Sequence, residues 1–388
     1  MIEYVEIREK ATRKIIGIID TAQSVIWKSL YYGVGDFEIY VEATPENIAF
    51  LSEGNYITRP NNYECGIIEH IEITDDSNDG KMIIASGRFV KSILSRRLTY
   101  SATLTGTGYN YIWSCVGNVL RGNVETAVRK LISDNAVDAT DVNRNIPEIY
   151  WTNDDISGIP DIIVTEDSGG QTTAAEKQAT YKNLLEYSDE VLQEYECGAK
   201  MWVDRELLKF RYKVFKGVDR SRDSTTNQPL IFSKDFDNLT STTYTLDSSA
   251  YKTTALIGGD GEGVNRKCAF SYAWVSGLER FETFVDASSI SSTYTDENEQ
   301  EQTYTNEVYR KMLESQGRQT IAEMQKVETF DGEIDLTNTN LVYGTDYNLG
   351  DVITIEDKDI RKYINARITT VTEVQDENGY KIEIEYGI

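Results

Sequence analysis

The chain has 388 residues, of which 40% are apolar, and this length exceeds what one simple core needs, so we expect two to four domains. Tyrosine is frequent, with 25 residues, whereas there are 5 prolines and 1 histidine, a composition typical of β-rich proteins with a few helices. The net charge of −25 argues against a basic nucleic-acid-binding surface and against docking on anionic lipid. It suits solubility alone and, equally well, a conduit that DNA crosses without sticking.

The four cysteines are widely spaced and form no CxxC pair: Cys65, Cys115, Cys197 and Cys268. With a single histidine in the chain, this spacing predicts free thiols, and we expect no metal site and no cofactor. The N-terminal sequence MIEYVEIREK is charged and alternating, unlike a signal peptide. Because no apolar run approaches the ~18 residues of a membrane span, we expect no membrane anchor.

Residues 1–100 predict a first compact antiparallel β domain. Short β-branched or aromatic runs separated by turn residues predict strands at Ile2–Arg8, Lys14–Ile19, Ser24–Leu30 and Asp36–Val41. Thr44 followed by Pro45 predicts the start of a short helix, since threonine caps helices and proline suits their first turn. Glu64–Ile73 and Lys81–Ala85 flank a polar tip and predict a hairpin. This order fits a small barrel or a sandwich.

Residues 101–218 have a different pattern and predict an inserted α+β domain. Asn123 is expected to cap a helix that carries Val124, Val128 and Leu131 on one face. A second helix is expected over Tyr181–Tyr195, where apolar residues recur at helical spacing. The strands Ala199–Val203 and Leu207–Phe215 would follow it.

The rest of the chain predicts a second β region interrupted by a helix. Residues 219–290 return to short strands, residues 291–326 contain an acidic loop and the longest helical pattern, and residues 327–388 are β again. Gly317 weakens that helix by roughly 1 kcal/mol unless something packs closely against it. Asn378–Gly379 predicts a hairpin turn. The last strand alternates, with Ile382, Ile384 and Tyr386 on one face and Lys381, Glu383 and Glu385 on the other.

For each candidate catalytic or ligand-binding motif, a structural role explains the residues better than a functional role does. His70 lies in a strand-like segment and completes no Ser-His-Asp or Cys-His pattern. Asp75–Gly80 matches a calcium loop in part, but Ser86 stands where a bidentate Glu is wanted, so a hairpin tip explains it better. Gly258–Gly263 holds two acids and lacks a following GK[ST], which predicts an inter-strand loop. We name no catalytic residue, although 64 carboxylates leave a glycosidase pair open.

Four segments carry a resemblance to a known family: VGDFEIYV (Val34–Val41), GRFVKSILSRR (Gly87–Arg97), YGTDYNLGDVITIED (Tyr343–Asp357) and ARITTVTEVQDENGYKIEIEYG (Ala366–Gly387). They resemble the phage tail-tip or baseplate hub family, the siphophage tail hubs. This family is similar to the N-terminal hub region of tail-associated lysins and to the T-even baseplate hub. The match follows the same order over nearly the whole chain and is less clear between residues 100 and 300. Its motifs are signatures of fold.

The resemblance implies a fold, an assembly and a set of partners. The fold class would be α+β, mainly β, with two tube-like antiparallel β-barrel domains plus an inserted α+β lateral domain. Three chains would form a homotrimer that presents six barrels to a hexameric tail tube. Its neighbours would be the tail tube or distal tail protein, the tape-measure protein, and a central spike or tail fibre. DNA would pass through without specific binding, in a virion tail tip or baseplate assembled in the host cytoplasm.

Related chains often continue into an adhesin or a hydrolase, whereas this sequence stops at Ile388, which predicts a separate spike or fibre and no enzymatic activity. An acidic inner surface would repel the phosphate backbone, and Glu383 and Glu385 are the candidates to face the lumen. Two alternatives stay open. One is a tail-associated cell-wall hydrolase acting as a glycosidase, and the other is a host-carbohydrate-binding adhesin whose tyrosines stack on sugars.

Overall fold

The computed structural model describes residues 2–60, 62–76, 80–99, 104–105, 108–109, 112–115, 123–152, 158–160, 165–166, 172–173, 177–271, 275–295, 300–334, 336 and 339–387. The chain forms two compact units, the first made of Met1–Ser241 with Glu333–Ile388 and the second of Thr242–Gly332. It passes from one unit to the other along two paired strands, β19 (Leu239–Asp247) and β25 (Val327–Ile334).

The described residues of the first unit form mainly strands, with three α-helices. The helices are α1 (Pro45–Phe50), α2 (Val124–Ile132) and α3 (Leu184–Glu194), with shorter turns at η1 (Val90–Arg96), η3 (Ser133–Val137), η4 (Val142–Arg144) and η5 (Lys234–Phe236). The strands are β1 (Val5–Arg8), β2 (Ile15–Ile19), β3 (Ser24–Leu30), β4 (Asp36–Glu42), β5 (Tyr56–Thr58), β6 (Cys65–Ile67), β7 (His70–Asp76), β8 (Gly80–Arg88), β9 (Leu104–Thr105), β10 (Gly108–Tyr109), β11 (Ile112–Cys115), β12 (Ile149–Tyr150), β13 (Thr165–Glu166), β14 (Thr172–Thr173), β15 (Lys177–Thr180), β16 (Gly198–Val203), β17 (Phe210–Phe215), β18 (Ile231–Ser233), β26 (Val352–Asp357), β27 (Lys362–Asp376) and β28 (Gly379–Gly387). The expectation of an α+β, mainly β chain is thus confirmed.

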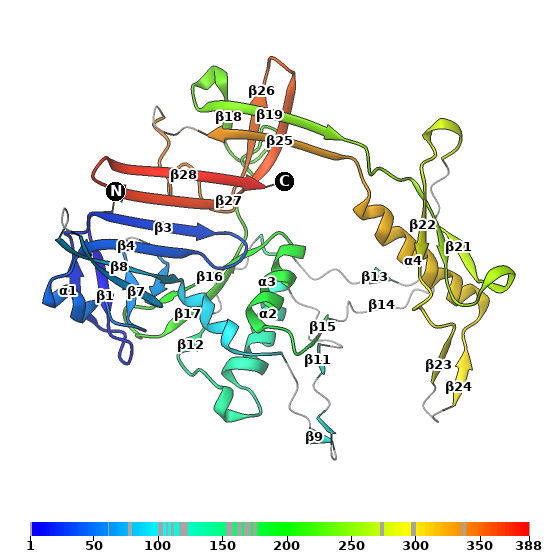
Figure 1. Cartoon of the computed structure of the whole chain (residues 1–388), viewed down its shortest axis with the longest axis horizontal. Coiled ribbons are helices and arrows are strands. Elements are labelled where there is room, and N and C mark those ends of the chain that lie inside the picture. Colours follow the sequence, from blue (N-terminus) through cyan, green and yellow to red (C-terminus); the bar gives the residue numbers. More distant parts are fainter. Residues whose placement is uncertain are drawn as a thin grey trace. The chain divides into compact units, whose positions relative to one another are not determined.

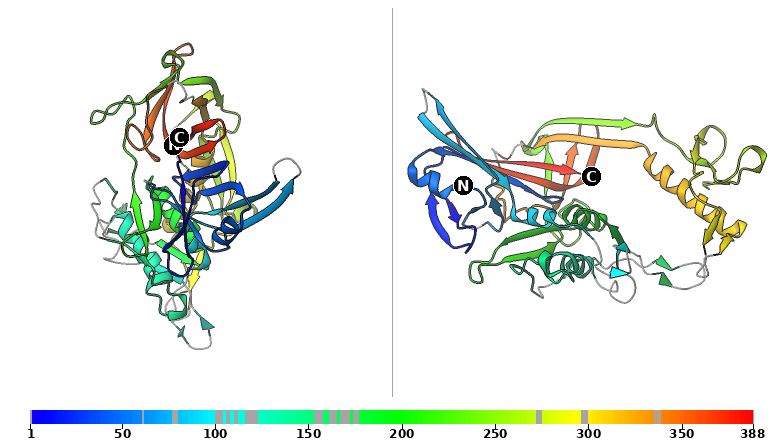
Figure 2. Two further views of the ribbon diagram at one scale, coloured as in Figure 1. Left: turned by 90° about the vertical axis from the view of Figure 1, so that its left-hand side faces the viewer. Right: turned by 60° about the horizontal axis from the view of Figure 1, so that its bottom comes forward.

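One eight-stranded sheet joins the two ends of the chain. Its order is β18-β26-β27-β3-β4-β8-β7, and β28 pairs with β27 as well. Along β27, Lys362–Arg367 pairs with β26, and Thr370–Gln375 pairs antiparallel with β3. Figures 1 and 2 show the blue strands β3 and β4 beside the red strands β27 and β28. The N-terminal and C-terminal β regions are therefore parts of one sheet.

The sheets formed by the described residues do not close into the two barrels that the resemblance implied. Within the described residues, the strand order ends at β7 and does not return to the strands at the other side. The reason is that β27 uses its inner edge for β3, so the strands of the C-terminal region extend the N-terminal sheet and do not close on themselves. The sheet is open at both sides.

A hydrophobic core of this unit lies between two sheets. A second sheet, in the order β2-β1-β5-β6, covers one face of the eight-stranded sheet. Trp27 and Phe37 from the large sheet pack with Val5, Ile7 and Ile57 from the small one, and all five are nearly inaccessible to solvent. The alternation of apolar residues along β3 and β4 creates this face, because successive side chains of a strand point to opposite sides.

The inserted α+β region packs as a layer of its own. Helices α2 and α3 lie with the sheet β12-β17-β16, and their apolar faces bury Leu131, Leu184 and Tyr212. Asn123 caps α2 by accepting a hydrogen bond from the Thr126 N–H at 2.9 Å, as its side-chain type predicted. The shared core of this layer includes residues of β5 and β6, so the small sheet is covered on both faces.

Tyr31 ties the insertion to the large sheet. Its hydroxyl donates a hydrogen bond to the carbonyl oxygen of Glu196 at 2.9 Å and accepts one from the Gly217 N–H at 3.3 Å. Gly350 approaches the other side of the ring, where an added Cβ would come within 2.2 Å of it, and its φ of +91° also favours glycine. The ring is fully buried, so three distant segments meet around one side chain.

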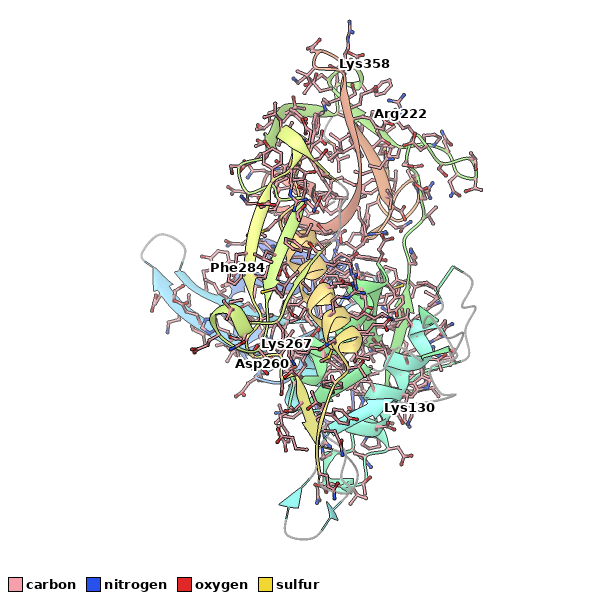
Figure 3. All side chains as sticks on the ribbon, turned by 90° about the vertical axis from the view of Figure 1, so that its right-hand side faces the viewer. Lys130, Arg222, Asp260, Lys267, Phe284 and Lys358 are labelled. Carbon is pink, nitrogen blue, oxygen red and sulfur yellow. The ribbon has the colours of Figure 1, made fainter. Side chains whose placement is uncertain are left out.

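The second unit is a small sheet covered by one long helix. It contains α4 (Asn306–Glu323), η6 (Gly263–Asn265), η7 (Gly277–Glu279), β20 (Thr254–Gly258), β21 (Cys268–Phe270), β22 (Glu282–Asp286), β23 (Thr293–Thr295) and β24 (Glu301–Thr303). The order is β21-β20-β22, and Ile257 packs so closely on Gly317 of α4 that an added Cβ would lie 2.5 Å away. This is the close packing that we expected to offset the weakening of the helix by Gly317. Phe284 of β22, labelled in Figure 3, is exposed.

Candidate functional site

The two faces of the eight-stranded sheet have opposite chemistry. On one face, Trp27, Phe37 and Val371 point into the core. Residues that alternate with them lie on the other face, which we call the open face. Direct cross-strand neighbours fix its membership: Glu383 pairs with Thr372, and Thr372 pairs with Lys28.

Acidic side chains outnumber basic ones on the open face. Following the register across β28, β27, β3, β4, β8 and β7, the charged residues and the histidine on this face are Lys28, Asp36, Glu38, Glu42, His70, Glu72, Arg88, Lys381, Glu383 and Glu385. Apart from the half-buried Lys28, all of them are exposed. Between them lie polar residues such as Ser86 and Thr372, and also the half-buried apolar residues Ile26, Ile84 and Val374. This surface has an excess of acidic side chains and is built on strands.

Glu383 and Glu385, the residues singled out in the sequence, both lie on the open face. They are exposed, whereas Ile384 between them is buried, so the predicted alternation of the last strand is confirmed. The hairpin before it is confirmed too, with Asp376 opposite Gly379, whose φ is +113°. The structure adds the carboxylates of β4 and β7, which sequence reasoning missed, although the alternating run DFEIYVE carried the signal.

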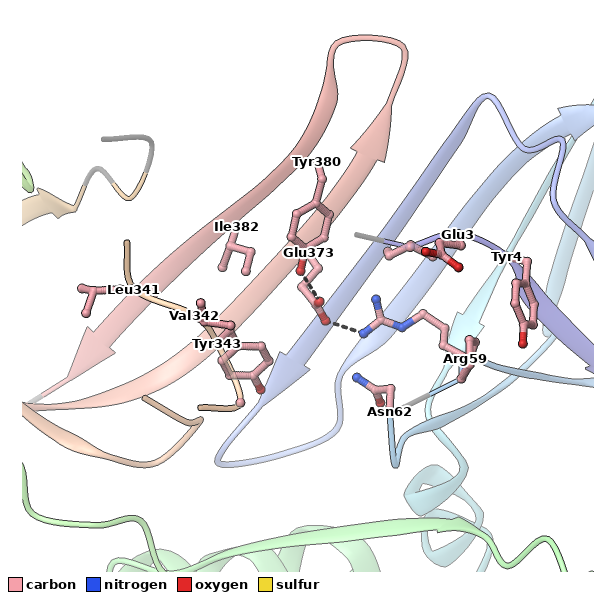
Figure 4. Close-up of a pocket in the computed structure, with 13 residues that line it drawn as sticks. Glu3, Tyr4, Arg59, Asn62, Leu341, Val342, Tyr343, Glu373, Tyr380 and Ile382 are labelled. Atoms are coloured by element: carbon pink, nitrogen blue, oxygen red, sulfur yellow. Dashed lines mark hydrogen bonds and ion pairs between the residues drawn. The ribbon is translucent and has the colours of Figure 1, made fainter. Parts of the chain in front are cut away.

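A buried ion pair supports the open face from behind, where β3 meets β27. Arg59 pairs with Glu373 of β27, and both side chains are less than one-tenth exposed. The Arg59 guanidinium lies 4.7 Å from the ring centre of Trp27, and the Tyr380 hydroxyl donates to Glu373 at 2.5 Å. Burial, together with this carboxylate, raises the pKa of Tyr380, which keeps the phenol a donor. Figure 4 shows the three side chains converging from three segments.

A cavity of about 490 Å³ opens above this pair. The strap formed by residues 341–344 covers it on one side, and Ile382 of β28 lines it on another. Of the polar groups that line it, Arg59, Glu373 and Tyr380 bind one another in one network, while the buried Arg59 Nε has no hydrogen-bond partner among the described residues. The arrangement is that of a structural junction, and it offers no nucleophile with an adjacent base.

Glu64 is the most perturbed carboxyl of this region. It accepts a hydrogen bond from the Ser29 hydroxyl and lies in a second cavity of about 420 Å³ with Lys200 and Tyr343. Burial raises the pKa of Glu64 to about 7, and burial lowers the pKa of Lys200 from its usual value. Near neutral pH, burial therefore pushes both groups toward their uncharged forms.

The other sequence candidates have structural roles or lie outside the described residues. His70 stands on the edge strand β7 with its side chain 64% exposed, 3.9 Å from Glu72. The Gly258–Gly263 segment connects β20 to β21, and its Asp260 accepts a hydrogen bond from the Ser292 hydroxyl. Residues 77–79 of the calcium-like loop and 296–299 of the acidic loop lie outside the described residues. Cys65, Cys197 and Cys268 are free thiols, as predicted.

The part of the chain that the structure describes contains neither a candidate metal site nor a candidate membrane-spanning helix. Among those residues, no three His, Cys, Asp or Glu side chains gather closely enough to hold a metal ion. Of the helices described, none combines the length and the apolar character that crossing a bilayer demands.

We predict that Glu373→Leu lowers the free energy of unfolding by about 3 to 5 kcal/mol, because Arg59 is left buried without its counter-charge. The double variant Arg59→Met/Glu373→Leu should recover much of this loss, since an apolar pair needs no compensation. Urea unfolding measures both. Glu190→Gln, which breaks an exposed pair with Lys182, is the control and should cost less than about 1 kcal/mol. A double variant as unstable as the single one would contradict the prediction.

A second prediction concerns pH. The folded chain holds the Glu64 proton more tightly than the unfolded chain, where this carboxyl titrates near 4.5, so its stabilisation is complete below that pH and is lost as pH rises through about 7. Glu64→Gln removes this loss. Relative to the parent, its free energy of unfolding should gain about 2 to 3 kcal/mol between roughly pH 5 and pH 8, measured by urea unfolding.

Glu69→Gln is the matched control for this titration. The hydrogen bonds from Arg88 hold the pKa of Glu69 below its usual value, so that carboxylate stabilises the fold above its ordinary pKa and loses this effect on acidification. The Glu69→Gln variant should therefore be less stable than the parent at both pH values, with no trend between them. Parallel pH curves for the parent and Glu64→Gln would show that Glu64 titrates normally.

Comparison with known proteins places the chain in a family. Residues 4–388 match the family model described as Siphovirus ReqiPepy6 Gp37-like protein. Among solved structures, the chain is similar to a tail protein from Neisseria meningitidis MC58 (TM-score 0.46, 10% identity, 99% of this chain and 95% of that chain). It is also similar to the 43 kDa tail protein of prophage MuSo2 from Shewanella oneidensis (0.49, 10%, 99% and 98%) and to prophage tail protein gp18 from Listeria monocytogenes EGD-e (0.48, 11%, 99% and 94%).

Curated proteins gave no match to the sequence. The family match, however, covers almost every residue and includes all four segments on which the resemblance to siphophage tail proteins was based. That recognition is confirmed. The chain belongs to the siphovirus ReqiPepy6 Gp37-like family.

Proposed function

We propose that this chain is a structural hub of a siphophage tail tip or baseplate, with no enzymatic role. Three copies form a ring that adapts the hexameric tail tube to a three-fold spike or fibre. In this proposal each chain supplies two tube-like β modules, one from residues 1–100 and one from residues 219–290 with 327–388, and the insertion 101–218 lies laterally. Family membership supports the tail role, and the open sheet supports the ring.

The observation that carries the proposal is the eight-stranded sheet itself. The N-terminal region supplies β3, β4, β7 and β8, and the C-terminal region supplies β18, β26, β27 and β28. Within the described residues, β7 pairs only with β8, and β28 pairs only with β27, so each has a free edge. A free strand edge exposes unpaired N–H and C=O groups, and closure into a ring satisfies them. Two modules per chain give a trimer six, which suits a hexameric neighbour.

The open face would form the wall of the channel. Its carboxylates on β4, β7 and β28 would line a surface that repels the phosphate backbone, so DNA slides along it without binding. The core face of the same sheet is covered by the β2-β1-β5-β6 sheet, which leaves the open face as the one available to a lumen. Glu383 and Glu385 are lumen-facing in this arrangement.

The test of the ring is the mass of the purified protein and an end view by class-averaged electron microscopy. We expect a mass three times that of the chain and a three-fold ring with a pseudo-six-fold inner wall. A monomer at every accessible concentration would overturn the hub. A zymogram on the same preparation distinguishes the hydrolase alternative, since a hub leaves peptidoglycan uncleared. Binding of the isolated chain to host cells would favour the adhesin.

The channel has a separate test in assembled particles. Replacing open-face carboxylates, as in Glu38→Gln/Glu385→Gln, should slow genome ejection severalfold while particles still form, because the wall repels phosphate less strongly. Single-particle ejection rates measure the effect. Glu186→Gln, on the exposed side of α3, is the control with the same chemistry away from the sheet. Failure of assembly in the double variant would instead mark these residues as interface residues.

A further inference from the structure

Among the described residues, β28 and β7 are two of the end strands of the eight-stranded sheet. Each step from β28 through β27, β3, β4 and β8 to β7 is antiparallel. After these five steps β7 runs opposite to β28. When the β7 edge of one copy meets the β28 edge of the next, the new pair is therefore antiparallel, like every pair from β28 to β7 in the chain itself.

The side chains on these edges limit the possible registers. On β7 the open face carries His70, Glu72 and Thr74, and on β28 it carries Lys381, Glu383 and Glu385. A shift by one residue would turn apolar side chains of one strand to the wrong face, so only shifts by two residues keep both faces. The choice among those is left to charge, since directly opposed like charges destabilise a strand pair and opposite charges stabilise it.

We propose that β7 of one copy pairs with β28 of a second copy in the register that places Glu72 opposite Lys381. His70 then stands opposite Glu383, so Glu72 meets a base and Glu383 meets the histidine, while Glu385 falls beyond the first residue of β7. A shift by two residues in one direction opposes Glu72 to Glu383, and a shift in the other opposes His70 to Lys381. This inference rests on the proposed ring and adds the strands and the register that close it.

The core face agrees with the same register. It places Ile71 opposite Ile382 and Ile73 opposite Tyr380, so apolar residues meet beneath the charged ones. Ile73 is 51% exposed in the single chain although it lies on the core-facing side of its strand. A hollow of about 690 Å³ lies at the edge of β28, lined in part by Leu336, Leu341 and Ile382. The second copy's Ile73 would fill part of this hollow, which removes apolar surface from water.

The charged side chains that would form this contact are exposed in the single chain. Lys381 lies against Glu383 on its own strand, and His70 lies 3.9 Å from Glu72 on its own, with all four side chains more than half exposed. Pairing the edges would assemble them into a square of alternating charge on the open face. Surface pairs of this kind contribute little each, so they select the register while the backbone hydrogen bonds and the apolar face supply the attachment.

Disulfide trapping tests the register directly. Opposed residues of an antiparallel pair have Cα atoms about 4.5 to 5.5 Å apart, within reach of a disulfide. In a Cys268→Ser background, Glu72→Cys/Lys381→Cys should oxidise to covalent trimers and no larger species, resolved on a non-reducing gel. The offset pair Glu72→Cys/Glu383→Cys should cross-link at least about tenfold more slowly. Faster trapping of the offset pair, or no trapping of the first pair in a protein that is trimeric by mass, overturns the register.

Charge reversal gives an independent readout. Glu72→Lys and Lys381→Glu should each raise the concentration at which half of the trimer dissociates by about tenfold or more, and the double variant should recover most of it. Glu53→Lys, an exposed site elsewhere in the unit, controls for the change in net charge. No recovery in the double variant counts against the pairing. A parent protein that never forms a trimer removes the proposed hub as well, so the two failures are distinguishable by mass alone.

Discussion

The pairing of β27 with β3 is the interaction on which the rest of the first unit depends. It joins residues more than three hundred positions apart in sequence and makes one sheet out of two β regions. Such a long-range contact closes a large loop, whose entropic cost must be offset by burial and hydrogen bonding at the junction. The Arg59–Glu373 pair, Trp27 and Tyr380 are concentrated there. The ion pair is buried, so its contribution is to fix how the two regions meet more than to add net stability.

The same sheet separates two kinds of chemistry by strand alternation. Apolar residues and the paired Glu373 face the core, while the exposed carboxylates of Glu38 and Glu383 lie on the open face. A strand can separate the two kinds of residue, because successive side chains point to opposite faces of the sheet and every second residue lies in one row. The net negative charge of the chain thus has a local expression that composition alone does not give, a sheet face on which acidic side chains outnumber basic ones.

The edge strands β7 and β28 expose backbone N–H and C=O groups that a further strand could pair with. Natural sheets usually blunt or cover their edges, whereas within the described residues β7 pairs only with β8 and β28 only with β27. Five antiparallel steps separate β28 from β7, so the two strands run in opposite directions. An edge-to-edge pair between two copies would therefore be antiparallel, like the pairs within the chain. A surface that is complementary to another part of the same chain leads naturally to a closed cyclic assembly when the rotation closes.

Much of the local structure was predictable from the sequence. Thr44 and Asn123 start helices through their side-chain caps, the Asn378–Gly379 pair marks a hairpin, and the last strand alternates as expected, because each of these depends on residues close together in the chain. Four sequence segments also indicated the relationship to siphophage tail proteins. The sequence also contained Glu383 and Glu385 as an outward-facing pair.

Only the tertiary structure decided which strands lie side by side, since β-pairing partners are set by contacts that no local pattern encodes. It placed β3 against β27, which replaced two separate barrels by one open sheet. It gathered Asp36, Glu38 and Glu72 onto the face of Glu383, and it buried Glu64 deeply enough to raise its pKa. Periodicity shows which residues share a face of one strand, and register across strands, which is a property of the folded sheet, shows which residues share a surface.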